Sequence, residues 1–364
     1  LLIWESPGGP RSTHIEFEDR LTLGSDSEAG DVDFHATHVT GTILNAGNNP
    51  NAMGMVPDAK ATVYGFNNDQ GEMTEELQEN SETMILSNHS YGVLAGWRFV
   101  NNDWSWEGDP DVSEVEDWKF GFYNQGARAY DGLIYNAPHY LIVKSAGNHR
   151  SDVGDGTRPA DGPYDIVSFR ATAKNIVTVG AVRKLDGEYT GPEDVEMSSF
   201  SSFGPTDDGR IKPDIVAPGV AVLSAGAAAD DEYLSLQGTS MATPVVTGGL
   251  ALIQQLNKEL GFELLLPPAV AVGYSPAWAQ YTVRTSQRSE VTDCFATYKI
   301  PSVVYYRTPA HLLGACACLG HKSGDFPNSE SAAESVLSLP FHPYLDEKTI
   351  VQIVSTLRQF APAS

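Results

Sequence analysis

Two histidines stand three residues apart in the segment FHATHVTGTI, residues 34–43, and this spacing allows three interpretations. His35 and His38 could be two ligands of a metal site. His35 could instead be the general base of a nucleophilic triad, with His38 packing one helical turn further on. The segment could also be the start of a buried helix with no chemical role. The other reactive residues of the chain decide between these hypotheses.

A serine at the start of a long apolar helix is the strongest chemical signal in the sequence. The segment LQGTSMATPVVTGGLALIQQL, residues 236–256, predicts a tight turn at Gly238 and a helix that begins near Ser240. The positive end of the helix dipole would favour negative charge that develops at this serine. Pro244 fits the first helical turn, where a missing N–H costs little. The simpler interpretation of Ser240 is an N-capping residue.

Two further residues supply what a serine nucleophile needs. Asn148 ends the apolar run YLIVKSAGN, and its amide could donate a hydrogen bond to an oxyanion. Glu5 ends the first apolar run, LLIWE, 30 residues before His35. An acid, a histidine and a serine in this chain order, with an asparagine donor, are the components of acyl transfer.

Residues 1–260 resemble the subtilisin-like (subtilase) serine peptidases in four motifs. HATHVTGT (35–42) is similar to the family's histidine motif, GTSMATP (238–244) to its serine motif, and SAGN (145–148) to its oxyanion-hole segment. SSFSSFGPTDDGRIKPDIVAPG (198–219) matches the stretch before the serine motif. The resemblance implies a serine endopeptidase with His35 as general base, Ser240 as nucleophile and Asn148 as oxyanion donor.

The resemblance also implies where a substrate would lie. Ser90, Tyr91 and Gly92 end the run MILSNHSYG and would line the cleft that holds an extended peptide. A peptide or protein is therefore the expected partner, bound by main-chain pairing with a strand edge. No cofactor is expected to be required for the chemistry.

Two positions depart from the family's pattern. The family's acid is usually an aspartate, whereas Glu5 occupies that place here, and Asp31 and Asp33 remain alternative acids. Glutamate is longer by one methylene and can still accept the histidine N–H. Ala36 stands where the family has glycine, which a helical first turn would tolerate.

Metal binding is weakly supported by the sequence. We predict no metal in the catalytic site, because no third ligand stands at a diagnostic spacing from His35 and His38. The segment NNDQGEM (67–73) could hold a structural calcium ion, as subtilases often do, and a solvated loop is the alternative. The acidic run 103–119 is interpreted as a solvated surface loop that leads into a helix.

Short apolar runs that alternate with helical stretches must position these residues. The runs LLIW, ATVYGF, MILSNHSYG, YLIVKSAGN, NIVTVGAV and PDIVAPG predict strands of a mostly parallel sheet that is buried on both faces. Function in such sheets gathers at the carboxyl ends of the strands. The predicted class is α/β, a three-layer subtilisin-like fold, followed by a small C-terminal α+β segment.

Charge and cysteine content divide the chain in two. Residues 1–268 hold 16 Lys and Arg against 40 Asp and Glu with no cysteine, whereas residues 269–364 hold seven of each charge and all three cysteines. We predict a peptidase domain over 1–268, truncated at both ends, and a separate segment over 269–364, joined near the proline-containing run 261–276. The net charge of −24 argues against nucleic acid and suits a secreted protein. No apolar run is long enough to span a membrane.

Residues 277–364 resemble a second family, the DegT/DnrJ/EryC1 PLP-dependent sugar aminotransferases, in their C-terminal small domain. The segments AWAQYTVRTSQR and IPSVVYYRTPAHLLGACACLG carry the likeness, within which two strands flank a short helix and further helices cover 328–338 and 346–360. The family's large domain has no counterpart, and Lys299, Lys322 and Lys348 lie outside its lysine motif. PLP binding is therefore not expected.

Two functions compete on this sequence. The first is a serine endopeptidase that works through an acyl-enzyme. The second is a non-catalytic pseudopeptidase or a chimeric fragment with no activity, which the Glu5 and Ala36 departures and the expected truncation of the fold support.

Overall fold

The computed structural model describes residues 1–28, 31–79, 85–137, 139–185, 187, 191–260, 281–285, 287–340 and 347–360. The chain divides into two compact units, Leu1–Leu252 and Ile253–Ser364. The run 261–276, where we predicted the boundary, lies outside the described residues. The division at 268/269 therefore stays a prediction.

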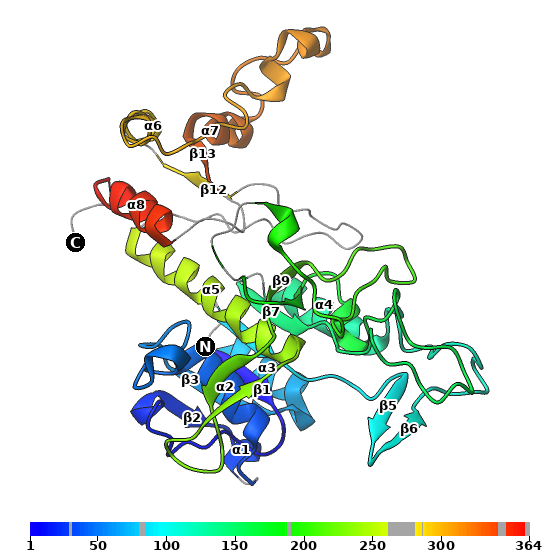
Figure 1. Ribbon diagram of the computed structural model, residues 1–364. Coiled ribbons are helices and arrows are strands. Elements are labelled where there is room, and N and C mark those ends of the chain that lie inside the picture. Colours follow the sequence, from blue (N-terminus) through cyan, green and yellow to red (C-terminus); the bar gives the residue numbers. More distant parts are fainter. Residues whose placement is uncertain are drawn as a thin grey trace. The chain divides into compact units, whose positions relative to one another are not determined.

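Seven strands form one parallel sheet in the first unit, in the order β2-β3-β1-β4-β7-β8-β9 (Figure 1). Their bounds are β1 Leu2–Glu5, β2 Leu21–Leu23, β3 Ala61–Gly65, β4 Ile85–His89, β7 Tyr140–Ser145, β8 Val177–Val182 and β9 Ile215–Pro218. All six apolar runs predicted as strands lie in this sheet. The short edge strand β2 was not predicted.

Helices cover both faces of the sheet. Alternate residues of β1 point to opposite faces, so Ile3 packs with α2 (Phe34–Leu44) and Trp4 packs with α3 (Asp69–Glu79) and α4 (Gln125–Asn136). The helix α5 (Thr239–Leu260) adds Met241 and Ala242 to the same face as α2. These three layers confirm the predicted α/β class.

The parallel arrangement brings the candidate residues to one edge. The neighbouring strands β1, β4 and β7 end at Glu5, His89 and Ser145. The segments that follow β4 and β7 carry Ser90 and Asn148. Because all three strands run the same way, their carboxyl ends meet at the same edge of the sheet.

The described part of the first unit also contains two antiparallel hairpins, a short α-helix and several 3-10 turns. The hairpins are β5 Trp97–Val100 with β6 Asp103–Trp106 and β10 Val222–Ala225 with β11 Tyr233–Leu236, and the short helix is α1 Ser25–Glu28. The acidic run 103–119 was predicted as a loop, but its first four residues form β6. The cross-strand pairing of Trp97 with Trp106 and of Phe99 with Trp104 explains this strand, since aromatic pairs stabilise hairpins.

The second unit is small and mixed, as predicted. Its described elements are β12 Tyr281–Arg284, α6 Arg288–Thr297, α7 Pro327–Ser335, β13 Val336–Leu339 and α8 Glu347–Arg358. Phe295, Leu337 and Leu357 belong to its own apolar core. The prediction of a strand over PSVVYY was wrong: only Val303 forms an isolated bridge, to Ser338, and the antiparallel partner of β12 is β13.

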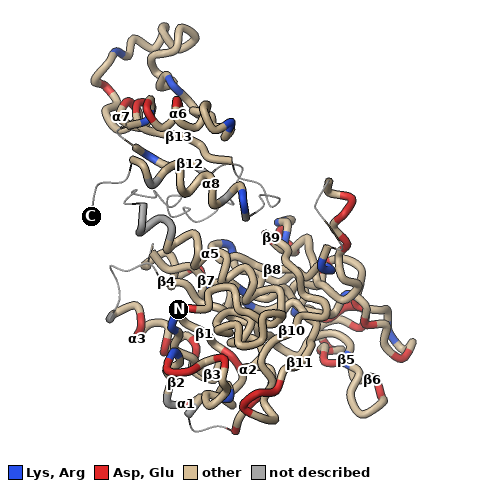
Figure 2. Tube along the Cα trace, turned by 60° about the vertical axis from the view of Figure 1, so that its left-hand side comes forward, with Lys and Arg blue, Asp and Glu red and all other residues tan. Residues whose placement is uncertain are grey.

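Acidic residues are spread over the first unit, where they outnumber the basic ones (Figure 2). None of the described helices is both long enough and apolar enough to cross a bilayer.

Candidate active site

His35 lies at the start of α2 and is paired with the last residue of β1. Its Nδ1 lies 2.8 Å from Oε2 of Glu5, whose side chain is 1% exposed. The other carboxylate oxygen, Oε1, is buried and has no hydrogen-bond partner among the described residues. The ring nitrogen Nδ1 therefore carries a proton that it donates to Glu5, which leaves Nε2 as the free base.

Among the described residues, Asp31 and Asp33, the alternative acids, form no hydrogen bond or ion pair with His35, whereas Glu5 does. Asp33 is the N-cap of α2, where its Oδ1 accepts the Ala36 N–H at 2.7 Å and the Ser6 hydroxyl at 2.8 Å. Asp31 is exposed. Ala36 is buried in the first turn of α2, where a methyl group fits a helical backbone.

The pKa of His35 reflects two opposing effects. Burial alone would lower it, but the charge of Glu5, its hydrogen bond and the charge of Asp33 outweigh burial, so the pKa of His35 is raised above its ordinary value. A raised pKa favours acceptance of a proton by the ring, which is what a general base requires.

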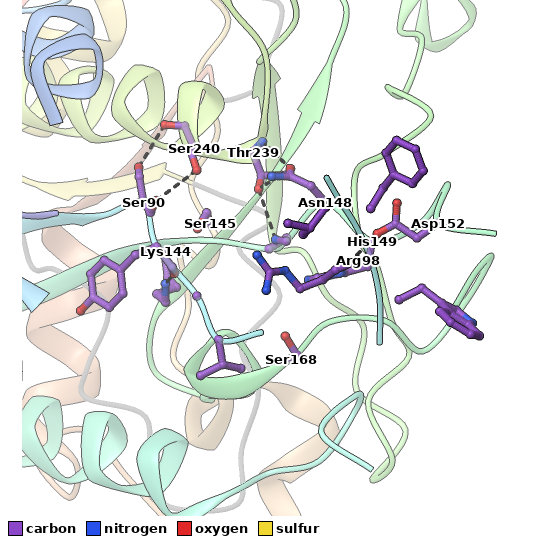
Figure 3. Close-up of a pocket in the computed structure, with 18 residues that line it drawn as sticks. Ser90, Arg98, Lys144, Ser145, Asn148, His149, Asp152, Ser168, Thr239 and Ser240 are labelled. Carbon is purple, nitrogen blue, oxygen red and sulfur yellow. Dashed lines mark hydrogen bonds and ion pairs between the residues drawn. The ribbon is translucent and has the colours of Figure 1, made fainter. Parts of the chain in front are cut away.

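Ser240 occupies the first turn of α5 and bonds reciprocally with Ser90. Its hydroxyl donates to the Ser90 carbonyl at 3.0 Å, and the Ser90 hydroxyl donates to the Ser240 carbonyl at 3.0 Å (Figure 3). Within the described part of the chain, no hydrogen bond joins Ser240 to His35. The Ser240 N–H belongs to the first turn of the helix, whose N–H groups have no partner within the helix.

Asn148 is oriented by Thr239, a residue that sequence reasoning did not select. Its Oδ1 accepts the Thr239 N–H at 2.9 Å and the Thr239 hydroxyl at 3.0 Å. Because the carbonyl side of the amide is fixed in this way, the NH₂ group is the one that is free, and among the described residues it has no hydrogen-bond partner. Asn148 thus presents a donor beside Ser240.

A pocket of about 370 Å³ opens next to these residues. The three predicted cleft residues, Ser90, Tyr91 and Gly92, line it, as do Asn148 and Ser240. The hairpin strand β5 and the loop after β7 form a further part of the wall. They contribute Trp97, Arg98, Phe99, Val100, His149 and Asp152, none of which the sequence singled out. A Cβ atom built at Gly92 would have no heavy atom within 4 Å apart from the adjoining residues, so the pocket is open there.

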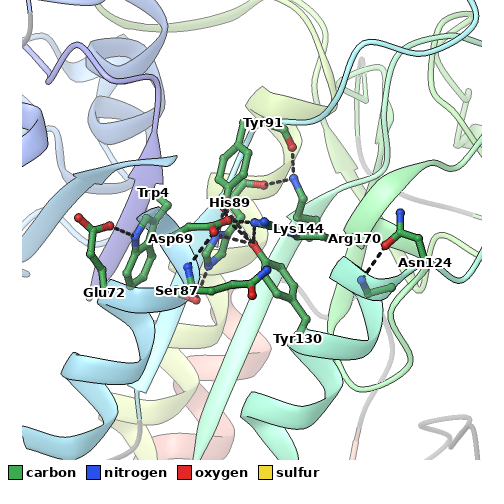
Figure 4. A network of polar contacts seen from close by, with 12 residues as sticks. Trp4, Asp69, Glu72, Ser87, His89, Tyr91, Asn124, Tyr130, Lys144 and Arg170 are labelled. Carbon is green, nitrogen blue, oxygen red and sulfur yellow. Dashed lines mark hydrogen bonds and ion pairs between the residues drawn. The ribbon is translucent and has the colours of Figure 1, made fainter. Parts of the chain in front are cut away.

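The side chain of Tyr91 joins a buried polar network (Figure 4). Its hydroxyl donates to Asp69 Oδ2 at 2.6 Å, lies 2.9 Å from the Tyr130 hydroxyl, and lies 2.9 Å from His89 Nδ1. Asp69 is in turn paired with Arg170. The network therefore fixes the backbone of the cleft wall from behind.

Lys144 is a buried lysine in the same wall, and it was not among the residues selected from the sequence. Its Nζ donates to the Tyr91 carbonyl and, at 3.4 Å, to the His89 carbonyl, and it lies 4.2 Å from the centre of the Tyr91 ring. Burial lowers the pKa of Lys144 to about 7, although the Glu5 carboxylate opposes this. Lys144 directly follows the apolar run YLIV, and its burial becomes evident only from the packing of β7.

His38 and the segment 67–73 were considered as metal ligands from the sequence, and the structure describes both. His38 is fully buried, its Nε2 lies 2.9 Å from the Val222 carbonyl, and burial lowers its pKa to about 4. It packs in α2, as predicted. The interpretation of 67–73 as a solvated loop was wrong, because the segment spans a helical turn and the start of α3, and its Asp69 is buried against Arg170. Calcium binding there stays a prediction.

Comparison with known proteins matches the chain to two families, and the two matches overlap over residues 250–293. The model of the subtilase family, peptidase family S8, matches residues 11–293, and the chain belongs to this family of serine proteases. The model of the DegT/DnrJ/EryC1/StrS aminotransferase family matches residues 250–358. Glu5 precedes the stretch matched to the subtilase family.

Individual relatives are distant. Serine protease AprX of Bacillus subtilis is 27% identical over 276 residues, which covers 68% of this chain and 55% of that protein. The pleiotropic regulatory protein of Geobacillus stearothermophilus is 34% identical over 106 residues, 29% of this chain and 28% of that protein. The matched part of the chain thus covers about half the length of AprX and 28% of the length of the pleiotropic regulatory protein.

Solved structures with a similar fold include sphericase, at 20% identity, 71% coverage of this chain, 77% of that chain and a TM-score of 0.48. The prenylagaramide maturation protease PagA is 19% identical, with 74% and 79% coverage and a TM-score of 0.47.

Proposed function

We propose that the chain hydrolyses peptide bonds by a serine endopeptidase mechanism. The observation that carries the proposal is the 2.8 Å hydrogen bond between Glu5 and His35, because it leaves Nε2 of His35 unprotonated. His35 then takes the proton of the Ser240 hydroxyl as that oxygen attacks the substrate carbonyl. The hydroxyl first turns from the Ser90 carbonyl to His35, a rearrangement that substrate binding commonly completes.

The tetrahedral intermediate is stabilised by two donors. The NH₂ of Asn148 and the N–H of Ser240 face the position of the oxyanion, and the helix dipole of α5 adds to their effect. Collapse of the intermediate transfers the proton from His35 to the leaving amine and forms the acyl-enzyme. Water activated by His35 then releases the acid and restores Ser240.

An extended peptide is the proposed substrate. The open backbone of Gly92 offers a strand edge to its main chain, and the pocket takes a side chain. Export is proposed from composition, because residues 1–268 are acidic and free of cysteine. The three cysteines of the second unit are free thiols.

Labelling with a fluorophosphonate, followed by peptide hydrolysis, tests the proposal. We expect Ser240 to be labelled, and both Ser240→Ala and His35→Ala to lose labelling and hydrolysis. Ser235→Ala is the matched control, because Ser235 lies exposed on β11 close to Ser240 in sequence and should leave both signals unchanged. A folded wild-type protein that takes no label would favour the non-catalytic alternative. The hydrogen bond from the Ser240 hydroxyl to the Ser90 carbonyl supports that alternative, because it holds the hydroxyl away from His35.

A further inference from the structure

Three side chains that the mechanism does not use lie close together, and two of them line the pocket. His149, Asp152 and Asp161 each present a ligand atom, and these atoms all lie within 4.8 Å of one another. The His149 Nδ1 lies 3.6 Å from Asp152 Oδ2. Figure 3 shows His149 and Asp152 next to Asn148. Because His149 directly follows Asn148, this cluster adjoins the oxyanion donor.

The backbone holds the three residues in this arrangement. The Asp152 N–H donates to the His149 carbonyl at 3.0 Å, and the Asp161 N–H donates to the Asp152 carbonyl at 3.0 Å. Asp161 Oδ2 also accepts the Trp97 N–H at 2.8 Å. The His149 ring packs against Phe120, with 5.5 Å between ring centres. Such outer contacts orient ligands in metal sites.

The donor set selects the class of cation. One imidazole and two carboxylates bind zinc-like ions at about 2.0–2.2 Å, and tetrahedral geometry then places the ligand atoms roughly 3.3 Å apart. The three atoms here would close toward the ion by side-chain rotation. Calcium prefers about six to eight oxygen ligands, which this cluster does not offer. The two carboxylates also balance the charge of a divalent ion.

We infer that His149, Asp152 and Asp161 form a binding site for a divalent transition-metal ion of the zinc class, and that the bound ion obstructs the substrate pocket. The three protein ligands leave a fourth position for water. The site itself stands independently of catalysis. The obstruction rests on the proposed function, because His149 and Asp152 line the pocket that also contains Ser240.

Calorimetric titration with Zn²⁺ tests the site without an activity readout. The full chain, free of any affinity tag and treated with a chelator, is first alkylated, because Cys294, Cys316 and Cys318 are free thiols that would bind zinc. Asp161→Asn keeps the acceptor for the Trp97 N–H and so preserves the fold. We expect this variant to bind one zinc equivalent fewer than the wild type. If binding persists, its affinity should fall by more than the roughly 10–100-fold expected for an outer-shell contact.

Co²⁺ absorption and a matched histidine variant complete the test. Tetrahedral Co²⁺ bands should appear in the wild type and disappear in His149→Asn, whereas exposed His139→Asn should retain them. Unchanged stoichiometry and affinity in both Asp161→Asn and His149→Asn would overturn the site, as would equal affinity for Ca²⁺. Zinc should slow peptide hydrolysis in the wild type but not in Asp161→Asn. Zinc binding without this inhibition would overturn the obstruction, and an inactive protein that binds zinc would overturn only the proposed function.

Discussion

Replacement of Glu5 by glutamine tests most directly whether Glu5 orients His35 for catalysis. The side chain of Glu5 is 1% exposed, and one carboxylate oxygen accepts from His35 while the other has no partner. If the glutamine NH₂ faces His35, the ring must carry its proton on Nε2 and cannot accept one from Ser240. If the glutamine carbonyl faces His35, the NH₂ is buried without an acceptor.

The second arrangement sets the size of the effect. A buried unpaired amide group costs about 1–3 kcal/mol, and the hydrogen bond to a charged group is worth about 1.5–3 kcal/mol. Together these amount to roughly 2.5–6 kcal/mol, or about 10²–10⁴ in kcat. The charge of Glu5 also raises the pKa of His35. The acidic limb of the kcat/KM profile should therefore shift to lower pH in Glu5→Gln, because the neutral base persists to lower pH.

Steady-state hydrolysis of a fluorogenic peptide across pH, with thermal unfolding of each variant, measures both effects. Glu72→Gln is the control, because Glu72 is also a buried carboxylate and glutamine can still accept from Trp4 Nε1. It should leave kcat and the pH profile unchanged. A loss below tenfold in a folded Glu5→Gln protein, or an unshifted acidic limb, would refute the role of Glu5.

Three further substitutions probe the oxyanion donor, the cleft and the buried cation. Asn148→Asp keeps the acceptor for Thr239 but removes the NH₂ donor, so kcat should fall by at least about 10²–10³ with little change in thermal unfolding; an effect on KM alone would contradict it. Gly92→Val should raise KM and leave stability intact, since its side chain would enter open pocket space; unaltered KM would argue against peptide pairing there. Lys144→Met should stabilise the protein most below pH 7, where the wild-type lysine is charged in both the folded and the unfolded state. This gain should shrink as the pH rises from about 7 toward 10.5, because over that range the lysine is protonated in the unfolded state but neutral in the folded state. Urea unfolding at pH 6 and pH 9 measures the difference, and a gain independent of pH would show that burial does not perturb Lys144.

Local patterns in the sequence were sufficient for most of the sheet. Six apolar runs became strands because a run buried on both faces needs only its own composition to be recognised. The same reasoning failed for PSVVYY, because β12 pairs with Val336–Leu339, a segment distant in sequence, instead.

The sequence by itself determined the family and singled out His35, Ser240 and Asn148 as candidates, because each lies in a short motif that can be recognised locally. The choice of acid was different. Asp33 is nearer to His35 in sequence than Glu5, yet it caps α2, and only the parallel register of β1 brings Glu5 to the histidine. The burial of Lys144 and the convergence of Asp161 on His149 were likewise decided by tertiary structure. Such contacts depend on how strands and loops pack, and no local pattern encodes the distance between residues that only packing brings together.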